Sequence, residues 1–567
     1  MDTAELDDSI ETLQKRKTDW AQLALADKVG LLRQARKRLG ARADDWVAAS
    51  VRAKEIDPQS PWAGEEWVCG PWALAAGING YLETLGALTK GQLPKTGKVS
   101  SRRTGQVVVR VFPTNFFDRV LLGGIYAEVW MQPGVTEANL GAQMAVFYKQ
   151  ERPRGKVALV LGAGNVNSIA PLDVLYRLFA LGHVVLLKLN PVNEYLGPIL
   201  EDIFGAFITA GYLRLARGGA DVGNYLAHHG GVEEIHLTGS ARTHDAIVYG
   251  AGAQGLERRR LKQPLLKKPV SSELGGIGPA VILPGKWSRA DIRYQAENVV
   301  TMKLHNNGFN CVAAQVLIVP AQWDQRDEFL DAVRQLMHEL PSRKAYYPGA
   351  ADRVKEALAG HPEAERLGDD HSGRALIPGL DGNSTGEYCF NTEIFGPVLA
   401  HTSLPGANAA EFLTNAVRFC NERLHGTLGA TIIGHPSTLR ELGPALDAAI
   451  ENLHYGAIGL NVWNAVAFLL AQATWGAFPG HTLDDIQSGL GVVRNSFLFE
   501  RPEKTVCKGC FYPFPRSWLH ANAALLPKPP WFVTNKTAHI TARRITRFAT
   551  DPRAKHLPGI VLAALRG

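Results

Sequence analysis

Short apolar runs alternate with segments of helical period along much of the chain. The runs KVALVLGAG, HVVLLKLN and VEEIHLTGS are each followed by a stretch in which apolar residues recur at every third or fourth position. Alternation of this kind is typical of a parallel sheet covered by helices. A second series of strand-like runs, AVILP, AAQVLIVP, VLAHTSL and LGATIIG, follows Glu273. The pattern therefore predicts an α/β fold with two sheet-containing domains.

The first part of the chain has a different pattern. Residues 9–53 carry Leu and Ala at helical spacing, which predicts two packed helices. QVVVRVFPTN, from Gln106, alternates as a strand, and the stretch from there to Gly155 is rich in glycine, proline and polar residues. We expect this stretch to form a hairpin or an excursion from the main sheet.

Length and composition set the broad class. The chain has 567 residues, of which 46% are hydrophobic and 20% charged, as in a globular protein of several domains. It shows neither a basic start followed by an apolar run nor an apolar run long enough to span a bilayer, so the expected location is the cytoplasm. Six cysteines are too few for a disulfide framework in so long a chain. A functional cysteine is therefore expected to be reactive rather than bridged.

The net charge of +7 comes from the C-terminal part. Residues 501–567 hold twelve Lys and Arg residues, so the rest of the chain is mildly acidic and is not expected to bind nucleic acid. A solvated or subunit-contacting extension is the simplest interpretation of this basic tail. Peripheral contact with a membrane or another anionic surface is the alternative, because Arg543, Arg544 and Arg547 have near-helical spacing.

The turn GAGNVN, after the first apolar run, admits three interpretations. A dinucleotide-binding loop needs glycines in the pattern GxGxxG and an acidic residue about twenty positions further on. Gly162 and Gly164 fit, but Asn167 occupies the third glycine position and the next apolar run ends without an acid. The turn is therefore an incomplete phosphate loop, an ordinary tight turn, or a turn that presents Asn165 for another purpose.

A candidate nucleophile follows in HNNGFNCVAAQVLIVP, which places Cys311 after a glycine-containing turn and before a strand-like run. A single cysteine is most often a small buried hydrophobic residue. A nucleophilic cysteine also needs a base or positive surroundings, and a donor for the oxyanion that it creates. Cys311 alone does not decide between these interpretations.

Five ordered motifs resemble those of the aldehyde dehydrogenase superfamily, over roughly residues 10–500. SSELGGIGP is similar to the family's Glu-Leu-Gly-Gly motif, which implies that Glu273 is the general base. NNGFNC is similar to Asn-x-Gly-x-x-Cys, which implies that Cys311 is the nucleophile. The resemblance thus implies that Cys311 attacks an aldehyde and that Glu273 activates the water that hydrolyses the resulting thioester.

The other three motifs imply cofactor contacts. NTEIFGPV resembles Glu-Ile-Phe-Gly-Pro-Val, which implies that Glu393 holds the nicotinamide ribose and that Phe395 packs beside that end of the cofactor. VVLLKLNP resembles the strand whose lysine contacts the adenosine ribose, here Lys188. IHLTGSARTH resembles the Thr-Gly-Ser loop near the pyrophosphate, here Gly239 and Ser240. The resemblance therefore implies NAD or NADP as the cofactor.

The choice between NAD and NADP stays open. Pro191 stands where the family usually has an acid that binds the adenosine 2′-hydroxyl, and His244 replaces the second glycine of the Gly-Ser loop. Pro191 lies where NAD and NADP differ, at the adenosine 2′ position. His244 lies where the resemblance places the pyrophosphate.

The resemblance also favours one interpretation of the GAGNVN turn. In the family, an asparagine about twenty-three residues before the cofactor lysine helps form the oxyanion hole, and Asn165 lies at that spacing from Lys188. FPTNFF, at Asn115, is closer to the family's usual motif but lies seventy-three residues before Lys188. Spacing therefore favours Asn165 as the oxyanion donor.

The implied architecture is an aldehyde-dehydrogenase-like α/β fold with two Rossmann-like domains. Residues 1–100 and 156–272 would bind the cofactor, and 273–460 would carry the nucleophile. Residues 101–155 and 480–567 would form an oligomerisation excursion and a C-terminal extension in a homodimer or homotetramer. NVWNAVAFLLAQATWGAF, residues 461–478, falls where the family lines its substrate tunnel, which favours an apolar aldehyde, although core packing explains the run equally well.

Three functions follow from these observations. NAD(P)-dependent oxidation of an aldehyde to a carboxylic acid is the first. A CoA-linked acylating dehydrogenase or an acyl-CoA reductase is the second, because GAGN is reminiscent of long-chain acyl-CoA reductases related to the superfamily. A binding protein that has lost catalysis is the third. No metal site is predicted, because CKGC, with Cys507 and Cys510, lacks a second ligand pair.

Overall fold

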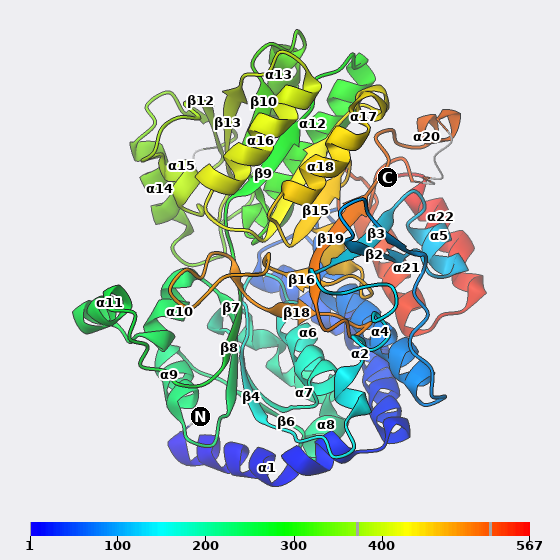
Figure 1. The fold of residues 1–567 in the computed structure, drawn as a ribbon, viewed down its shortest axis with the longest axis vertical. Helices are drawn as coiled ribbons and strands as arrows, with labels where there is room; N and C mark the ends of the chain where they lie inside the picture. The colour runs from blue at the N-terminus through cyan, green and yellow to red at the C-terminus, as the bar shows by residue number, and fades with distance from the viewer. Residues whose placement is uncertain (1, 370–372, 521–523, 525) are drawn as a thin grey trace.

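The computed structural model describes residues 2–369, 373–520, 524 and 526–567. Two large β-sheets lie one above the other, and helices cover both (Figure 1). A two-stranded ribbon of β16 (Trp475–Gly476) and β18 (Val492–Arg494) lies between them. The predicted α/β class is confirmed.

The first sheet has six strands in the order β17-β8-β7-β4-β5-β6, and all except the edge strand β17 are parallel. Its central strands are buried on both faces, which explains their continuous apolar sequence. The strands are β4 (Val157–Leu161), β5 (Val184–Lys188), β6 (Leu213–Ala216), β7 (Glu234–Gly239), β8 (Val270–Leu274) and β17 (Gly489–Leu490).

Helices and short helical turns connect these strands. They are α6 (Ile169–Leu175), η3 (Tyr176–Ala180), η4 (Pro191–Leu196), α7 (Gly197–Ile203), α8 (Gly205–Thr209), α9 (Ala220–His228), α10 (Ala241–Val248) and α11 (Gly252–Arg260). The chain thus alternates between strand and helix as the sequence pattern predicts.

The second sheet has eleven strands in the order β1-β2-β3-β19-β15-β14-β9-β10-β13-β12-β11. The run from β19 to β12 is parallel, and the edge strands at both ends are antiparallel. The parallel strands are β9 (Gly278–Ile282), β10 (Ala314–Pro320), β12 (Ala375–Leu380), β13 (Val398–Leu404), β14 (Gly429–Ile433), β15 (Ala457–Leu460) and β19 (Pro502–Lys508). The others are β1 (Val99–Ser101), β2 (Val107–Phe112), β3 (Tyr126–Met131) and β11 (Glu365–Arg366).

The helices around the second sheet include α12, which leads to the candidate nucleophile, and α14 and α15, which precede the candidate cofactor residues. They are α12 (Arg289–Leu304), η5 (His305–Gly308), α13 (Arg326–Glu339), α14 (Ala350–Ala359), α15 (Tyr388–Asn391), α16 (Ala409–Arg423), α17 (Pro436–Leu442), α18 (Pro444–Asn452) and α19 (Val466–Leu469). Two shorter elements, α5 (Phe116–Leu121) and η2 (Val146–Lys149), belong to the segment that joins β2 to β4.

Two boundaries differ from the sequence expectation. Glu273 lies inside β8 of the first sheet, so the connection between the two sheets begins after Leu274 and not at residue 273. Residues 502–508 form β19, which pairs with β15 on one side and β3 on the other. The last part of the chain therefore contributes an internal strand to the second sheet and is not simply an appended extension.

The basic tail folds back onto the N-terminal helices. These are α1 (Thr3–Gln22), α2 (Leu25–Ala53), α3 (Ala63–Trp67), η1 (Val68–Trp72) and α4 (Ala73–Leu88), and the tail adds α20 (Arg516–Leu519), α21 (Ala538–Thr550), η6 (Ala554–His556) and α22 (Leu557–Ala564). Helix α21 packs against α3 so closely that a Cβ atom on Gly64 would lie 2.6 Å from the backbone of Ala538. Arg543 of α21 pairs with Asp44 of α2 at 2.8 Å. Part of the tail's positive charge is thus used within the chain itself.

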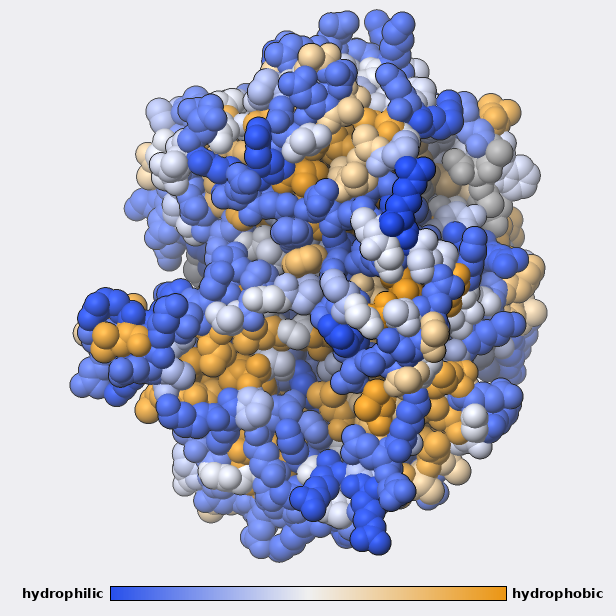
Figure 2. Space-filling view, viewed as in Figure 1, coloured by the Kyte–Doolittle hydropathy of each residue, from blue (hydrophilic) through white to orange (hydrophobic). Residues whose placement is uncertain are grey.

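One element projects from the body. Helix α11 extends away from the rest of the molecule, and Figure 2 shows apolar surface at its tip. Leu256, Leu261 and Leu265, in and after this helix, are 70%, 46% and 46% exposed. Within the described residues, none of the helices combines the length and hydropathy that crossing a bilayer requires.

Candidate active site

Cys311 and Glu273 come from different sheets and meet at their junction. Cys311 follows η5 and precedes β10, whereas Glu273 lies in β8. The Cys311 Sγ donates a hydrogen bond to Glu273 Oε1 at 3.4 Å. Glu273 is fully buried and Cys311 is partly exposed. Two residues that the sequence placed in separate motifs therefore form one pair.

The backbone conformation of the turn before Cys311 explains why its motif contains asparagine and glycine. Asn306, Asn307 and Gly308 have φ values of 52°, 54° and 78°, in the left-handed region that asparagine and glycine tolerate best. A Cβ atom on Gly308 would lie 2.4 Å from the carbonyl oxygen of Gly396, so only glycine fits there. The turn thus brings the Cys311 segment against the loop that carries the candidate cofactor residues.

The surroundings of the pair disfavour negative charge. Burial raises the pKa of the Cys311 thiol well above its ordinary value, and the Glu273 and Glu393 carboxylates raise it further. Burial also raises the pKa of Glu273. The Arg494 guanidinium opposes both shifts. At rest, the pair is therefore a protonated thiol that donates to a carboxyl group.

Asn165 lies in the loop after β4, beside the same cavity as Cys311. Its side-chain amide donates to the Phe309 carbonyl at 3.1 Å. Its own backbone carbonyl accepts hydrogen bonds from Tyr346 Oη at 2.9 Å and from Asn306 Nδ2 at 3.1 Å. The loop is therefore fixed by residues next to the nucleophile.

The two glycines of this turn allow close approach. A Cβ atom on Gly162 would lie 2.8 Å from Ala170, and one on Gly164 would lie 2.6 Å from the Asn190 side chain. Asn115, the alternative from sequence, is the exposed N-cap of α5 and donates no group to this cavity. Of the three interpretations, the structure favours a turn that presents Asn165.

The cavity is narrow and lined mainly by apolar side chains. Its volume is about 40 Å³. Trp463, Val466, Phe468, Leu469 and Trp475, all from the apolar run at residues 461–478, form much of its wall. That run therefore contributes to the cavity as well as to the core.

The candidate cofactor residues lie at the carboxyl ends of parallel strands. Lys188 ends β5, and Gly239 ends β7 and precedes Ser240, the N-cap of α10. Strand β4 lies between β5 and β7, so the Asn165 loop is flanked by these two ends. The carboxyl ends of strands are where open α/β sheets bind ligands. A cavity of about 260 Å³, lined by Gly164, Pro191 and other residues, borders the same edge.

Glu393 and Phe395 approach from the second sheet. Both oxygens of the Glu393 carboxyl group lie 2.1 Å from where a Cβ atom on Gly275 would be, so this glycine leaves the space that the carboxyl group occupies. Burial raises the pKa of Glu393 to about 8. Phe395 has a φ of 46° and packs its ring on Phe309, with ring centres 5.7 Å apart. The segment that carries Glu393 and Phe395 thus contacts both the glycines that follow Glu273 and the segment that carries Cys311.

Sequence analysis missed two charged or polar residues near the pair. Arg494, in β18, is 8% exposed, and its guanidinium carbon lies 3.3 Å from the centre of the Phe468 ring. His305, the first residue of η5, is 2% exposed and lines the cavity. Arg494 matches no motif, because it reaches Cys311 only through the tertiary fold. His305 lies six residues before Cys311 in the chain, but nothing in the local sequence shows that its side chain is buried beside the cavity.

The two cysteines of CKGC lie in different surroundings. Cys507 is buried within β19, and the Cys510 thiol donates to the Gly124 carbonyl at 3.5 Å.

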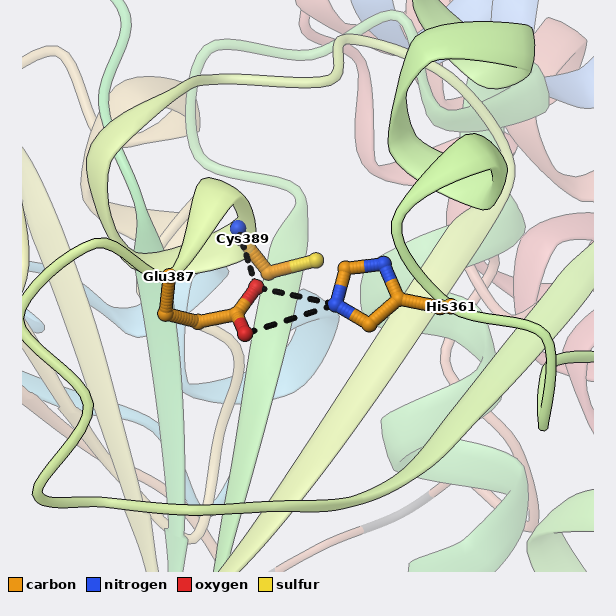
Figure 3. Close-up of side chains that lie close together, drawn as sticks. All are labelled: His361, Glu387 and Cys389. Atoms are coloured by element: carbon orange, nitrogen blue, oxygen red, sulfur yellow. Dashed lines mark hydrogen bonds and ion pairs between the residues drawn. The ribbon is translucent and has the colours of Figure 1, made fainter.

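A different cluster, His361, Glu387 and Cys389, brings metal-type donors together in the second domain (Figure 3). His361 Nδ1 faces the Ala357 carbonyl at 2.5 Å, and Nε2 faces both Glu387 oxygens at 3.1 and 3.3 Å. Both ring nitrogens of His361 thus face oxygen atoms, one from the backbone and the other from the Glu387 side chain. The pair ties the end of α14 to α15, a few residues before Glu393.

Curated relatives match part of the chain. N-succinylglutamate 5-semialdehyde dehydrogenase of Sphingopyxis alaskensis is 29% identical over 338 residues, which are 56% of this chain and 64% of that protein. Coniferyl aldehyde dehydrogenase of a Pseudomonas species is 25% identical over 291 residues, 48% of this chain and 56% of that protein. The chain thus spans about half to two thirds of the length of these curated relatives.

Solved structures share the fold over most of the chain. The NADP complex of NADP-dependent glyceraldehyde-3-phosphate dehydrogenase from Bacillus halodurans is similar with a TM-score of 0.58 and 16% identity, covering 90% of this chain and 92% of that one. Lactaldehyde dehydrogenase from Escherichia coli is similar with a TM-score of 0.57 and 16% identity, covering 88% and 90%. At this identity the likeness concerns the fold alone.

The sequence model of the aldehyde dehydrogenase family matches residues 125–467, more than half of the chain. This stretch contains Asn165, Lys188, Glu273, Cys311 and Glu393. The chain belongs to the aldehyde dehydrogenase family.

Proposed function

We propose that this protein oxidises an apolar aldehyde to the carboxylic acid with NAD or NADP. The observation that carries the proposal is the Cys311 thiol, 3.4 Å from the Glu273 carboxylate, in an apolar cavity that it shares with Asn165. A thiol nucleophile, a carboxylate base and an amide donor are the three groups that this chemistry requires.

In the first step, the Cys311 sulfur forms a bond to the aldehyde carbon, and the thiol proton leaves for an acceptor. Glu273 Oε1 orients the thiol by accepting its hydrogen bond, and the proton itself passes to water, so that the carboxylate stays free for the later hydrolytic step. The negative charge that develops on the aldehyde oxygen would be held by the Asn165 amide and the backbone N–H of Cys311. A donor of this kind contributes about 3 kcal/mol to the barrier reduction. The product is a thiohemiacetal on Cys311.

The aldehyde carbon then loses a hydride and becomes the carbonyl carbon of a thioester. When bound, the oxidised nicotinamide supplies the hydride acceptor. Glu273 would then take a proton from water while the water oxygen attacks the thioester, which releases the acid and the thiol. The raised pKa of Glu273 supports this role, because a base is most effective when its pKa lies closer to the working pH.

The residues that would hold the cofactor fit a dinucleotide in kind. One edge of the first sheet supplies a cation, an open backbone and a capped helix start, from Lys188, Gly239 and Ser240 respectively. The second sheet supplies a carboxyl group from Glu393 and an aromatic ring from Phe395. NAD and NADP both remain candidates.

The test is nicotinamide reduction with a panel of medium-chain and long-chain aldehydes, with each cofactor, with and without coenzyme A. Turnover without coenzyme A that is lost in Cys311→Ala and kept in Cys510→Ala, a control at another partly exposed thiol, is the expected result. Turnover only with coenzyme A would favour the acylating or reductase alternative. Wild-type protein that neither turns over aldehydes nor gains thermal stability with either cofactor would favour the non-catalytic alternative.

The assembly is a separate proposal. A homodimer or homotetramer is supported by the exposed leucines in and after α11, since projecting apolar surface is typical of interfaces. Size-exclusion chromatography with light scattering tests it, and a monomer at micromolar concentration would contradict it.

A further inference from the structure

A buried ion pair from the N-terminal helices lies behind the loop that carries Asn165. Lys54 directly follows α2, Glu66 lies in α3, and their side chains meet at 2.7 Å. Both residues are almost fully buried, with exposed fractions of 7% and 3%. Burying two charges costs several kcal/mol per ion unless further hydrogen bonds satisfy their remaining groups. The hydrogen-bond partners of this pair therefore indicate which parts of the chain it holds.

The Lys54 ammonium group contacts both segments that meet at the nucleophile. It donates to the Asn306 side-chain oxygen at 3.1 Å and to the Asn165 backbone carbonyl at 3.4 Å. Together with Glu66, these acceptors use all three N–H groups of the ammonium. Burial alone would lower the pKa of Lys54, but the Glu66 carboxylate outweighs this effect and the pKa is raised. A charged donor therefore joins the Asn165 loop to the turn before Cys311.

The two acidic residues of α3 hold the same two segments. Glu66 accepts a hydrogen bond from the side chain of Asn167, in the Asn165 loop, at 3.1 Å. Glu65 accepts one from the backbone N–H of Asn306 at 3.0 Å. Each segment is thus held at two points by groups that belong to neither sheet. The N-terminal helices therefore contribute to the distance between the two segments.

This distance matters because the proposed oxyanion hole takes one donor from each segment. The Asn165 amide has two N–H groups, and one of them donates to the Phe309 carbonyl, which leaves the other for an oxyanion. The backbone N–H of Cys311 is the second donor. Donors of this kind act fully only when they are held within about 0.5 Å of the productive geometry.

We propose that Lys54 and Glu66 are positioning residues that set the spacing of the two oxyanion donors. Neither side chain lines the cavity beside Cys311, so the pair acts through Asn165 and through the turn before Cys311. The inference rests on the proposed function, because it concerns the same nucleophile and the same oxyanion. It gives the N-terminal helices a part in the chemistry, although the family model matches only from residue 125 onward.

Two reactions of the Cys311 thiol separate positioning from a general structural role. With p-nitrophenyl acetate, the sulfur bonds to the acetyl carbon, an oxyanion forms and collapses, nitrophenolate leaves, and the thiol proton passes to water. With iodoacetamide, the same sulfur displaces iodide and no oxyanion forms. Neither reaction needs a cofactor or an aldehyde. The readout is the ratio of the acylation rate to the alkylation rate, each corrected for the rate of Cys311→Ala.

The main variant combines Lys54→Met with Glu66→Gln. It removes both charges together, so that no unpaired charge stays buried. The Asn165 carbonyl and the Asn306 side-chain oxygen keep the Tyr346 hydroxyl as a donor, at 2.9 and 3.0 Å. The ratio is expected to fall about tenfold, because a misplacement of about 1 Å can cost about 100-fold in rate.

Lys28→Met is the matched control. Lys28 is 1% exposed and lies near the start of the same helix, α2, so its ratio is expected to equal that of wild type. A fall of less than about twofold in the main variant would overturn the inference. Equal losses in acylation and in alkylation would also overturn it, because a general structural effect slows both reactions alike.

Lys54→Arg keeps the inference testable where the main variant does not fold. It retains the charge and the pair with Glu66, and a cavity of about 260 Å³, which Lys54 lines, has room for the larger head group. The planar guanidinium does not reproduce the three donor directions of the ammonium, so the ratio is expected to fall here as well. An unchanged ratio in Lys54→Arg would overturn the inference.

A mutant cycle with Asn165→Ala tests the route of the effect. Because the pair acts partly through Asn165, the main variant is expected to lower the ratio less in the Asn165→Ala background than in wild type. Independent, fully multiplied losses would overturn the inference, and so would a wild type that is alkylated but not acylated at Cys311. A wild type that oxidises no aldehyde but shows the expected ratios would instead count against the proposed function.

Discussion

Replacing Glu273 by glutamine is expected to make Cys311 more reactive toward a small alkylating agent while it abolishes aldehyde oxidation. Glu273 accepts the thiol hydrogen bond at 3.4 Å, and its negative charge raises the pKa of Cys311. Glutamine keeps the shape of the side chain and removes the charge. The thiolate is then less disfavoured, whereas the base needed for hydrolysis is lost.

The size of the effect follows from the distance. Two unit charges 3.4 Å apart repel each other by about 1.2 kcal/mol in a water-like medium and by about 5 kcal/mol at an effective dielectric constant of 20. Even the smaller figure corresponds to a roughly eightfold larger thiolate fraction at a pH where the thiol form dominates. A less basic thiolate is also a weaker nucleophile, and this offsets about half of the gain on a logarithmic scale. The eightfold larger thiolate fraction is therefore expected to accelerate alkylation by at least about threefold.

The assay is iodoacetamide labelling without cofactor or aldehyde, followed by mass spectrometry of the peptide that contains Cys311, at a pH where Glu273 is ionised in wild type. Arg494→Met is the opposite control, because Arg494 lowers the pKa of Cys311 and its loss is expected to slow labelling. Slower labelling of Glu273→Gln than of wild type would refute the electrostatic argument. It would show instead that Glu273 activates the thiol as a general base.

Three further predictions concern neighbouring residues. Asn165→Ala is expected to lower kcat by about 100- to 1,000-fold, with a lower melting temperature because the hydrogen bond to the Phe309 carbonyl is also lost, and a loss of kcat below about tenfold would contradict its role as oxyanion donor. Gly275→Ala is expected to raise the KM for the cofactor more than that for the aldehyde, because its Cβ atom would displace the Glu393 carboxyl group, and equal effects on both would contradict this. Glu393 has a pKa of about 8, above its ordinary value of 4.5, so wild type is expected to lose unfolding free energy as pH rises between these two values. Denaturant unfolding should show a flatter pH dependence for Glu393→Gln over that range, and parallel curves would contradict the prediction.

The sequence identifies the reactive residues better than their surroundings. Cys311, Glu273 and Asn165 each follow from a motif or a spacing, and the structure brings all three to one place. His305 and Arg494 could not be found in this way. A lone histidine or arginine is normally a solvated residue, and their burial next to the nucleophile depends on contacts between segments far apart in the chain.

The fold, too, has parts that the local sequence predicts and parts that depend on contacts between distant segments. Alternating strand and helix patterns predict the parallel core, because each local period reports its own element. The segment PEKTVCK, by contrast, has polar residues typical of an edge or a loop, yet it forms the internal strand β19. Lys504 explains part of this difference. Its side chain is 1% exposed, and its ammonium group donates to the backbone carbonyls of Ile450, Glu451 and Leu453. A charge that caps a helix end from within a sheet cannot be recognised from local hydrophobicity.

The distance between Cys311 and Glu273 is itself a tertiary property. Glu273 lies in the first sheet and Cys311 in the turn before β10 of the second, so the separation of the two groups depends on how the chain crosses between the sheets at Gly275, Gly276 and Gly278. A Cβ atom on Gly276 would lie 2.8 Å from the Ser488 hydroxyl oxygen, and one on Gly278 would lie 2.5 Å from the Ala313 carbonyl oxygen. These contacts leave no room for side chains, so the glycines hold the two sheets at close approach. The motif that carries Glu273 therefore also sets the spacing between the Glu273 carboxyl group and the Cys311 thiol.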